Sequence, residues 1–92
     1  MKLKPTTKIK RNKETMFKEI EEVVYILDPR NATIYTLNKT ASFIWKNLEK
    51  PLSIEKIISL VYDRFEVKIE KVRKDVMRFV SKYLKEEFVQ KA

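Results

Sequence analysis

The spacing of apolar residues changes once along this chain, and that change constrains the fold more than any other feature of the sequence. Up to Leu37, three short runs rich in β-branched and aromatic residues, at 16–20, 23–27 and 33–37, have the composition of β-strands. After Leu37 the apolar residues recur about every 3.6 positions, which is the repeat of an α-helix. The sequence therefore predicts an α+β fold in which strands come first and helices follow.

The residues between the second and third runs predict a hairpin turn. Asp28 suits the first position of a turn, Pro29 pre-sets the backbone of the second, and Asn31 tolerates a left-handed conformation. We therefore expect the three runs to form an antiparallel meander. In the third run, alternation puts Tyr35 and Leu37 on one face, which we expect to be the core, and the residues at 34 and 36 on the other.

Three helices are predicted after the meander. Asn38 can cap the first, which ends before Pro51, and Ser53 can cap the second. The residues 66–68 form a short connection to the third helix, and residues 88–90 could add a short strand. The apolar stripes of the three helices are Ala41, Ile44, Trp45 and Leu48, then Ile54, Ile57, Ile58, Val61 and Phe65, then Ile69, Val72, Val76, Phe79, Val80 and Tyr83. This order is a winged-helix-like outline, a three-stranded antiparallel meander followed by three helices.

The composition excludes several classes of protein. With 92 residues the chain has room for one hydrophobic core, so one domain is expected. It contains no Cys and no His, which removes thiolate and imidazole catalysis, disulfides and the usual zinc or iron sites. It contains no Gly, which disfavours phosphate-binding loops. We therefore expect a non-enzyme with no catalytic residue, metal or cofactor.

The formal charge of +8 is unevenly distributed. Residues 1–14 hold six basic side chains and one acidic side chain, whereas residues 15–92 hold fifteen and twelve. We therefore expect residues 1–14 to be a mobile basic arm, either solvated or held in a DNA groove, in front of a folded domain at 15–92. No apolar run is long enough for a signal peptide or a membrane span, so a cytoplasmic protein without a membrane partner is expected.

An ordered set of short motifs resembles the PqqD-like family, named for the pyrroloquinoline quinone synthesis protein D. The set comprises Leu27-Asp28-Pro29 at the turn, Tyr35 before the stretch from Leu37 to Trp45, Ser53-Ile54-Glu55-Lys56-Ile57 at the second helix and Val72 to Val80 in the third. It extends over about residues 15–89. Departures occur at Lys68-Ile69 and Glu86-Glu87, where family members often have an Asp-Pro cap and a Gly, and these affect helix capping more than the binding groove.

The resemblance implies a recognition element for ribosomally made, post-translationally modified peptides. Such domains bind the leader of a precursor peptide as an extra strand and bring it to a modifying enzyme, often a radical SAM protein. The physics agrees, because an edge strand offers unpaired N–H and C=O groups to an extended peptide. The edge would be residues 33–37, with a groove against the third helix. The candidate peptide-binding residues are Thr33, Ile34, Tyr35, Thr36, Leu37, Lys71, Arg73, Asp75, Met77, Arg78 and Lys82.

Several alternatives stay open at this point. Taken singly, each charged candidate is better explained as part of a solvated helix face, whereas together they could attract an acidic or amphipathic leader. The sequence does not choose which flank of the third helix faces the groove. The chief rival function is a winged-helix DNA-binding protein, although the near balance of charge in residues 15–92 makes nucleic acid a less suitable partner. An oligomerising or structural subunit, including a homodimer, is the third interpretation.

Overall fold

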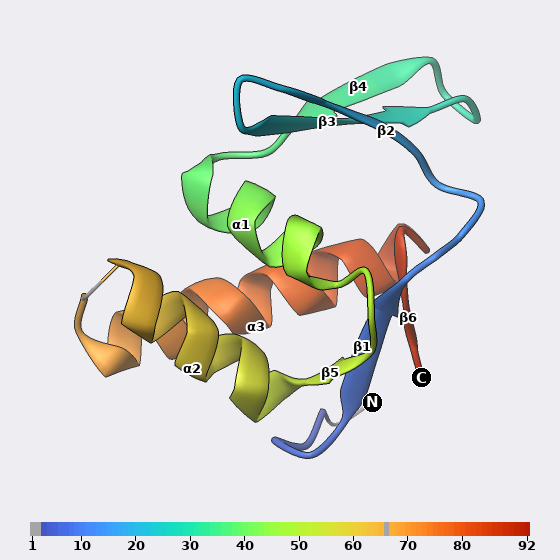
Figure 1. The fold of residues 1–92 in the computed structure, drawn as a ribbon. Coiled ribbons are helices and arrows are strands. Elements are labelled where there is room, and N and C mark those ends of the chain that lie inside the picture. The colour runs from blue at the N-terminus through green and yellow to red at the C-terminus, as the bar shows by residue number, and fades with distance from the viewer. Residues whose placement is uncertain (1–2, 66) are drawn as a thin grey trace.

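The computed structural model describes residues 3–65 and 67–92 (Figure 1). The elements follow one another as β1 (Lys8–Arg11), β2 (Met16–Ile20), β3 (Val23–Asp28), β4 (Thr33–Thr36), α1 (Lys39–Asn47), β5 (Leu52–Ser53), α2 (Ile54–Phe65), α3 (Ile69–Lys85) and β6 (Val89–Lys91). Both the α+β class and the order of a meander followed by three helices are confirmed. Of the connection predicted at 66–68, Glu66 lies outside the described residues.

The meander is the antiparallel sheet β2–β3–β4. Direct cross-strand partners such as Met16 and Leu27, and Leu27 and Ile34, lie on the same face of this sheet. The left-handed residue in the β3–β4 turn is Ala32, with φ of 54°, so the expectation that Asn31 would take this role is wrong. Asn31 instead accepts a hydrogen bond from the Thr33 N–H through its side chain, at 3.2 Å, which fixes it in an Asx-type turn.

The helices begin at the predicted caps. The Asn38 Oδ1 accepts the Ala41 N–H at 2.8 Å, and the Ser53 Oγ accepts the Lys56 N–H at 3.1 Å. Each bond satisfies one of the N–H groups that the first turn of a helix leaves without an intrahelical partner. The polar residues Asn38 and Ser53 thus decide where α1 and α2 begin.

A second sheet, ordered β5–β1–β6, joins segments that are far apart in the sequence. Within it Ile9 pairs with Leu52 on one side and with Lys91 on the other, and its side chain is completely buried. The expectation of a mobile arm over residues 1–14 is therefore wrong for residues 8–11, because pairing on both edges and burial of Ile9 hold this strand in the fold. Of the expected arm, residues 1 and 2 lie outside the described residues.

A single hydrophobic cluster connects all the layers. Trp45 of α1 and Leu48, which caps the C-terminus of this helix, are fully buried, and helix α1 packs on one face of the β2–β3–β4 sheet (Figure 1). Buried Ser42 links this helix to the sheet, because its Oγ accepts the Val24 N–H at 3.0 Å and donates to the Leu37 carbonyl at 3.1 Å. Trp45 is thus the core anchor that its place in the helical stripe predicted.

Within the described part of the chain, no helix combines the length and the apolar character needed to cross a bilayer.

Candidate functional site

Strand β4 forms an edge of the meander, because it pairs with β3 alone among the described residues. Just beyond its end, the Leu37 N–H donates to the Val24 carbonyl at 2.9 Å. Backbone groups in an antiparallel strand alternate in direction, so those of Tyr35 point toward β3 as well. The N–H and C=O groups of Ile34 and Thr36 therefore point away from the sheet, where an added strand could pair with them.

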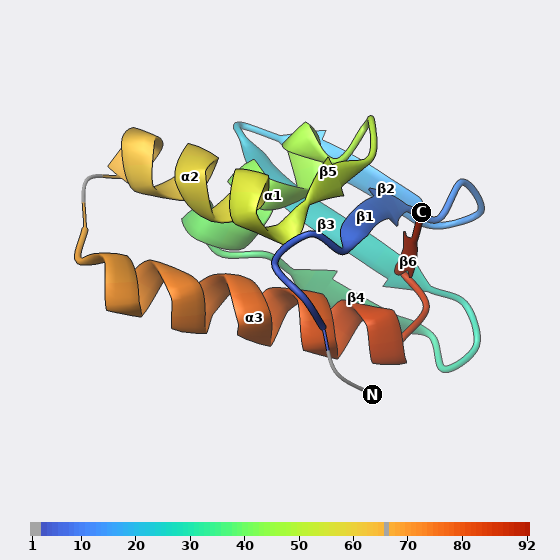
Figure 2. The same ribbon diagram turned by 90° about the horizontal axis from the view of Figure 1, so that it is seen from below.

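Side chains near the C-terminal end of helix α3 reach this edge strand, which lies next to the helix in the view of Figure 2. The Lys82 Nζ lies 5.7 Å from the centre of the Tyr35 ring on β4 and 5.6 Å from the centre of the Tyr83 ring on α3. Phe88 completes the connection, because its ring lies 5.2 Å from that of Tyr35 and 5.8 Å from that of Tyr83. This aromatic packing fixes the separation between the edge strand and the helix.

A hollow of about 310 Å³ lies between the first turns of α1 and the outward flank of α3. Its lining residues are Asn38, Thr40, Ala41, Ile44, Lys71, Asp75, Arg78, Phe79, Lys82 and Tyr83. We call the surface formed by this hollow and the free edge of β4 the edge groove. Lys82 connects the two parts, because it lines the hollow and its Nζ lies over the Tyr35 ring of β4.

The charges in the edge groove are mostly positive. Asp75 is its only carboxylate among the described residues, and it is engaged by Lys71 Nζ at 3.1 Å and by Arg78 Nη1 at 4.0 Å. Asp75 is the more enclosed member, with 25% of its side chain exposed, whereas both cations extend into solvent. Among the described residues, Lys82 has no acidic group within ion-pair distance. The groove therefore presents an uncompensated positive charge next to the free strand edge.

Tyr83 supplies a neutral hydroxyl at the floor of the hollow. Burial raises the pKa of its phenol, and the nearby Tyr35 raises it further. The hydroxyl thus remains protonated at neutral pH and can both donate and accept a hydrogen bond.

The structure gathers some of the predicted site residues and separates others. Ile34 and Thr36 are exposed, while Tyr35 and Leu37 face the core as their alternation predicted. Lys71, Asp75, Arg78 and Lys82 form one stripe along α3 that lines the hollow. Two predicted residues, Arg73 and Met77, do not line it. Met77 is half-buried and packs against the core instead.

The contribution of α1 to the groove was not predicted from the sequence. Asn38 was assigned only as a helix cap, and Ala41, Ile44, Phe79 and Tyr83 only as parts of apolar stripes. The available signal was the cap itself, because Asn38 directly follows the predicted edge strand and so must lie at one end of any groove along it.

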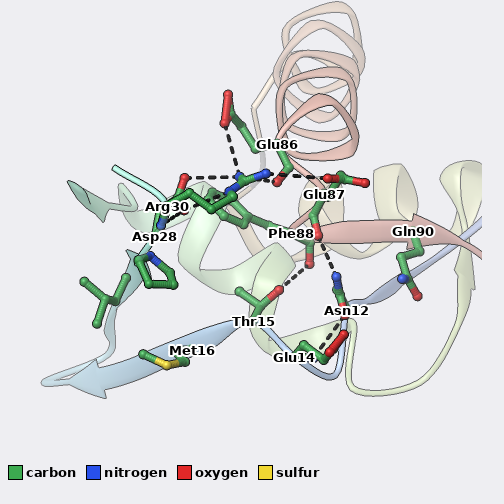
Figure 3. A pocket seen from close by; sticks show the side chains of 12 residues that line it. Asn12, Glu14, Thr15, Met16, Asp28, Arg30, Glu86, Glu87, Phe88 and Gln90 are labelled. Carbon is green, nitrogen blue, oxygen red and sulfur yellow. Dashed lines mark hydrogen bonds and ion pairs between the residues drawn. The ribbon is translucent and has the colours of Figure 1, made fainter. Parts of the chain in front are cut away.

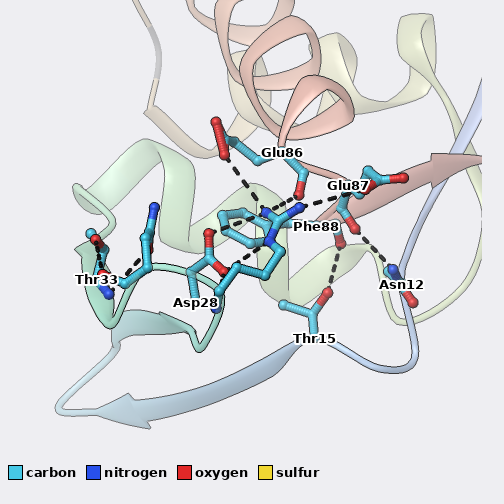
Figure 4. Close-up of polar contacts among 9 residues, drawn as sticks. Asn12, Thr15, Asp28, Thr33, Glu86, Glu87 and Phe88 are labelled. Atoms are coloured by element: carbon cyan, nitrogen blue, oxygen red, sulfur yellow. Dashed lines mark hydrogen bonds and ion pairs between the residues drawn. The ribbon is translucent and has the colours of Figure 1, made fainter.

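A network of polar contacts, which we call the Arg30 clamp, ties the β3–β4 turn to the α3–β6 turn (Figures 3 and 4). The Arg30 Nε donates to Asp28 Oδ1 at 3.0 Å, and its Nη2 donates to the Glu86 carbonyl at 2.8 Å. Arg30 also lies 3.5 Å from the Glu87 carboxylate. The connection before β2 joins the same turn, because the Asn12 Nδ2 donates to the Glu87 carbonyl at 2.9 Å.

The clamp also sets the charge state of its acid. Hydrogen bonding to the Arg30 side chain holds the pKa of Asp28 below its ordinary value of 3.8, although burial acts in the opposite direction. The same pair raises the pKa of Arg30. Because the clamp joins the turn before β4 to the end of α3, it holds these two elements of the edge groove in place.

A second hollow of about 410 Å³ is lined by these turns (Figure 3).

In the described part of the chain, no group of three or more acidic side chains is placed to hold a metal ion.

Comparison with protein families matches residues 24–89 to the family described as Coenzyme PQQ synthesis protein D (PqqD). No curated protein matches the chain significantly. The match extends from the second strand of the meander to β6, and so includes every described residue of the edge groove.

Three solved structures share the fold. TbiB1 in complex with the TbiA(beta) leader peptide is 22% identical, with a TM-score of 0.76 over 88% of this chain and 94% of that one. Lasso peptide synthetase B1 complexed with its leader peptide is 18% identical, with a TM-score of 0.73 over 89% and 96%. The PqqD truncation of Methylobacterium extorquens PqqCD, described as a stand-alone recognition element for ribosomally synthesised and post-translationally modified peptides, is 9% identical, with a TM-score of 0.74 over 97% and 95%.

Proposed function

The chain belongs to the Coenzyme PQQ synthesis protein D (PqqD) family, and from this we propose that it is a non-catalytic adaptor for the leader of a ribosomally made precursor peptide. It binds the leader by strand addition in the cytoplasm and presents it to a modifying enzyme of the radical SAM class. The observation that carries the proposal is the free edge of β4 beside the positively charged stripe of α3.

The two parts of the edge groove have different roles in this proposal. The outward backbone groups of Ile34 and Thr36 pair with the leader main chain, which supplies affinity that depends little on the leader sequence. The side chains of Lys71, Arg78 and Lys82 select a leader that is acidic or amphipathic. Two of the similar structures are described as complexes with leader peptides, which supports the assignment of the ligand class.

The test uses a short precursor peptide, to be sought among the genes that neighbour the gene for this chain. Titration of its synthetic leader into the isotopically labelled protein is expected to shift the amide signals of residues 33–37 and 71–82. Unmoved signals in both segments would contradict strand addition at β4. Tight binding of duplex DNA with a steep dependence on salt would favour the DNA-binding alternative.

A charge reversal on each flank of α3 tests which side forms the groove. Lys82→Glu is expected to weaken leader binding by about tenfold, the size of effect that a well-placed interface residue has. Arg73→Glu makes the same change in charge outside the hollow and is expected to leave the dissociation constant within about twofold. An equal loss in the two variants would mean that the leader responds to overall charge and not to the edge groove.

A further inference from the structure

The outer face of the β2–β3–β4 sheet, opposite α1, is a concentrated apolar surface. Register puts eight side chains on this face: Met16, Lys18, Ile20, Val23, Tyr25, Leu27, Ile34 and Thr36. Met16, Leu27 and Ile34 form one continuous row across the three strands, with exposed fractions of 48%, 38% and 63%. Ile20, at the other end of β2, is 49% exposed.

The apolar side chains on this face are more closely grouped than is usual for a sheet face in contact with solvent. Exposed apolar side chains scattered over a surface are ordinary, whereas a contiguous patch marks an interaction site. Among the described residues, four of the seven large apolar side chains that are exposed lie on this one face. The helices all lie on the other side of the sheet, so no described element covers the patch (Figure 1).

The charge on the outer face indicates what kind of surface it would meet. Lys18 is the only charged side chain among the eight, and it lies between the apolar row and Ile20. No described carboxylate is within ion-pair distance of it. A partner that buries this face therefore needs an apolar surface with a carboxylate placed opposite Lys18.

A second copy of the chain fits this requirement poorly. Two outer faces packed about a two-fold axis would bring two Lys18 side chains toward each other, between chains that each carry a formal charge of +8. The patch is also small, because three strands that average five residues have a footprint of roughly 250 Å², from the usual strand spacing and rise. A stable interface typically buries about 800 Å² on each partner, so any partner must also contact surface beyond these eight side chains.

Strand addition would enlarge the same face. Side chains of a β-strand alternate between the two faces of a sheet, so a leader paired with β4 would place every second side chain beside Ile34 on the outer face. A protein docked there would contact the sheet and the leader as one continuous surface.

We propose that the outer face of the β2–β3–β4 sheet is the docking surface for the modifying enzyme, which binds it through an apolar patch with a carboxylate opposite Lys18. This inference rests on the proposed function, because the leader on β4 completes the surface. It assigns the two sides of the adaptor separate partners. The edge groove takes the peptide and the outer face takes the enzyme.

The test measures two dissociation constants for the same variants. The probes are the synthetic leader and a purified radical SAM enzyme, to be sought among the genes that neighbour the gene for this chain. The double variant Met16→Ser/Ile20→Ser changes only β2, two strands away from the leader edge. We expect it to weaken enzyme binding by at least about tenfold and to leave leader binding within about twofold. Lys18→Glu is expected to weaken enzyme binding as well, with little effect on the leader.

Tyr62→Ser on α2 is the matched control, because Tyr62 is 45% exposed but lies away from the outer face. It is expected to change neither constant. Thermal unfolding of each variant checks that the fold is intact, and Lys18→Glu keeps the test valid if the double variant does not fold.

The outcomes separate the two proposals. If the enzyme binds the outer-face variants as tightly as wild type while the leader still binds, the docking surface is wrong and the adaptor function stands. If the enzyme does not bind the wild type while the leader does, the docking surface and the presentation step are both wrong, and only leader binding stands. If the wild type does not bind the leader, the proposed function is wrong. A wild-type dimer in sedimentation equilibrium that Met16→Ser/Ile20→Ser dissociates would identify a second copy as the occupant and overturn the proposal.

Discussion

The two three-stranded sheets of this protein are built in opposite ways. Strands β2, β3 and β4 are consecutive and joined by short turns, so their sheet forms from one continuous segment. Strands β5, β1 and β6 come from the middle and the two ends of the chain. The first sheet leaves its edges and its outer face open, whereas the second encloses the fully buried Ile9 and ties both ends of the chain to the core.

This difference indicates that one sheet contributes mainly to stability and the other mainly to binding. A strand that is paired on both sides and buried contributes to stability and has no free edge to offer. The local meander is anchored on its inner face by Trp45 and Ser42, so its other surfaces are available for binding. The Arg30 clamp connects the two parts, because it joins the meander turn to the turn that leads into β6.

Truncation of one apolar side chain in each sheet is expected to have the largest effect, and it tests whether the two sheets contribute differently to stability. Ile9→Ala in β1 is expected to lower the free energy of unfolding by about 2–5 kcal/mol, because it leaves a cavity in the core. Ile34→Ala in β4 is expected to change it by less than about 0.5 kcal/mol, because that side chain is exposed. Urea denaturation measures both. Equal losses would mean that β1 is no more anchored than the edge of the meander.

Acid titration measures how much the Arg30 clamp contributes to the pH dependence of stability. The pKa of Asp28 is lower in the folded state than in the unfolded chain, so its stabilisation is complete above pH of about 4. This stabilisation is lost as the pH falls through the lowered pKa that Asp28 has in the folded state. Asp28→Asn keeps only one of the two oxygens that accept hydrogen bonds from Arg30 and removes the charge. We therefore expect lower stability at neutral pH and a smaller decrease between about pH 5 and 2. Parallel pH profiles for the two proteins would show that the clamp is not the source of the acid sensitivity.

The smallest expected effect concerns the β2–β3 turn, which belongs to the sheet that forms locally. Glu21 and Glu22 have φ of 50° and 69°, values that glycine adopts without a steric penalty. Glu22→Gly is expected to raise the free energy of unfolding by up to about 1 kcal/mol. Glu22→Ala serves as the control, since it keeps the steric cost and is expected to give no gain. Thermal unfolding distinguishes them, and destabilisation by Glu22→Gly would argue against a strained turn.

Most of the meander and the helices could be predicted because their signals are local. The turn at Asp28-Pro29, the cap at Asn38 and the stripe that contains Trp45 each lie within a few residues of the element that they define. The left-handed position at Ala32 could not be read in this way, because Ala has no preference for that conformation over its neighbour Asn31. The geometry of the closed hairpin decides which turn residue takes the left-handed conformation.

Strand β1 was missed because Ile9 is one apolar residue among basic ones, and composition alone makes such a segment resemble a solvated arm. Its partners lie more than forty residues away at Leu52 and more than eighty away at Lys91. Burial that depends on such distant pairing leaves no periodic pattern in a four-residue strand.

The sequence by itself determined the class of fold, the edge strand and the amphipathic third helix, because hydrophobic period and capping act over a few residues. It left the binding side of α3 undecided, since charges occur on both flanks of the buried stripe. Only the tertiary structure decided that Lys71, Asp75, Arg78 and Lys82 lie on the flank of α3 that lines the hollow and, at Lys82, reaches Tyr35 of β4, whereas Arg73 and Met77 do not line it. The physical reason is that the helix can turn only one face to the core, and the packing of Tyr83 against Phe79 and Phe88 then fixes which flank is turned toward the sheet edge.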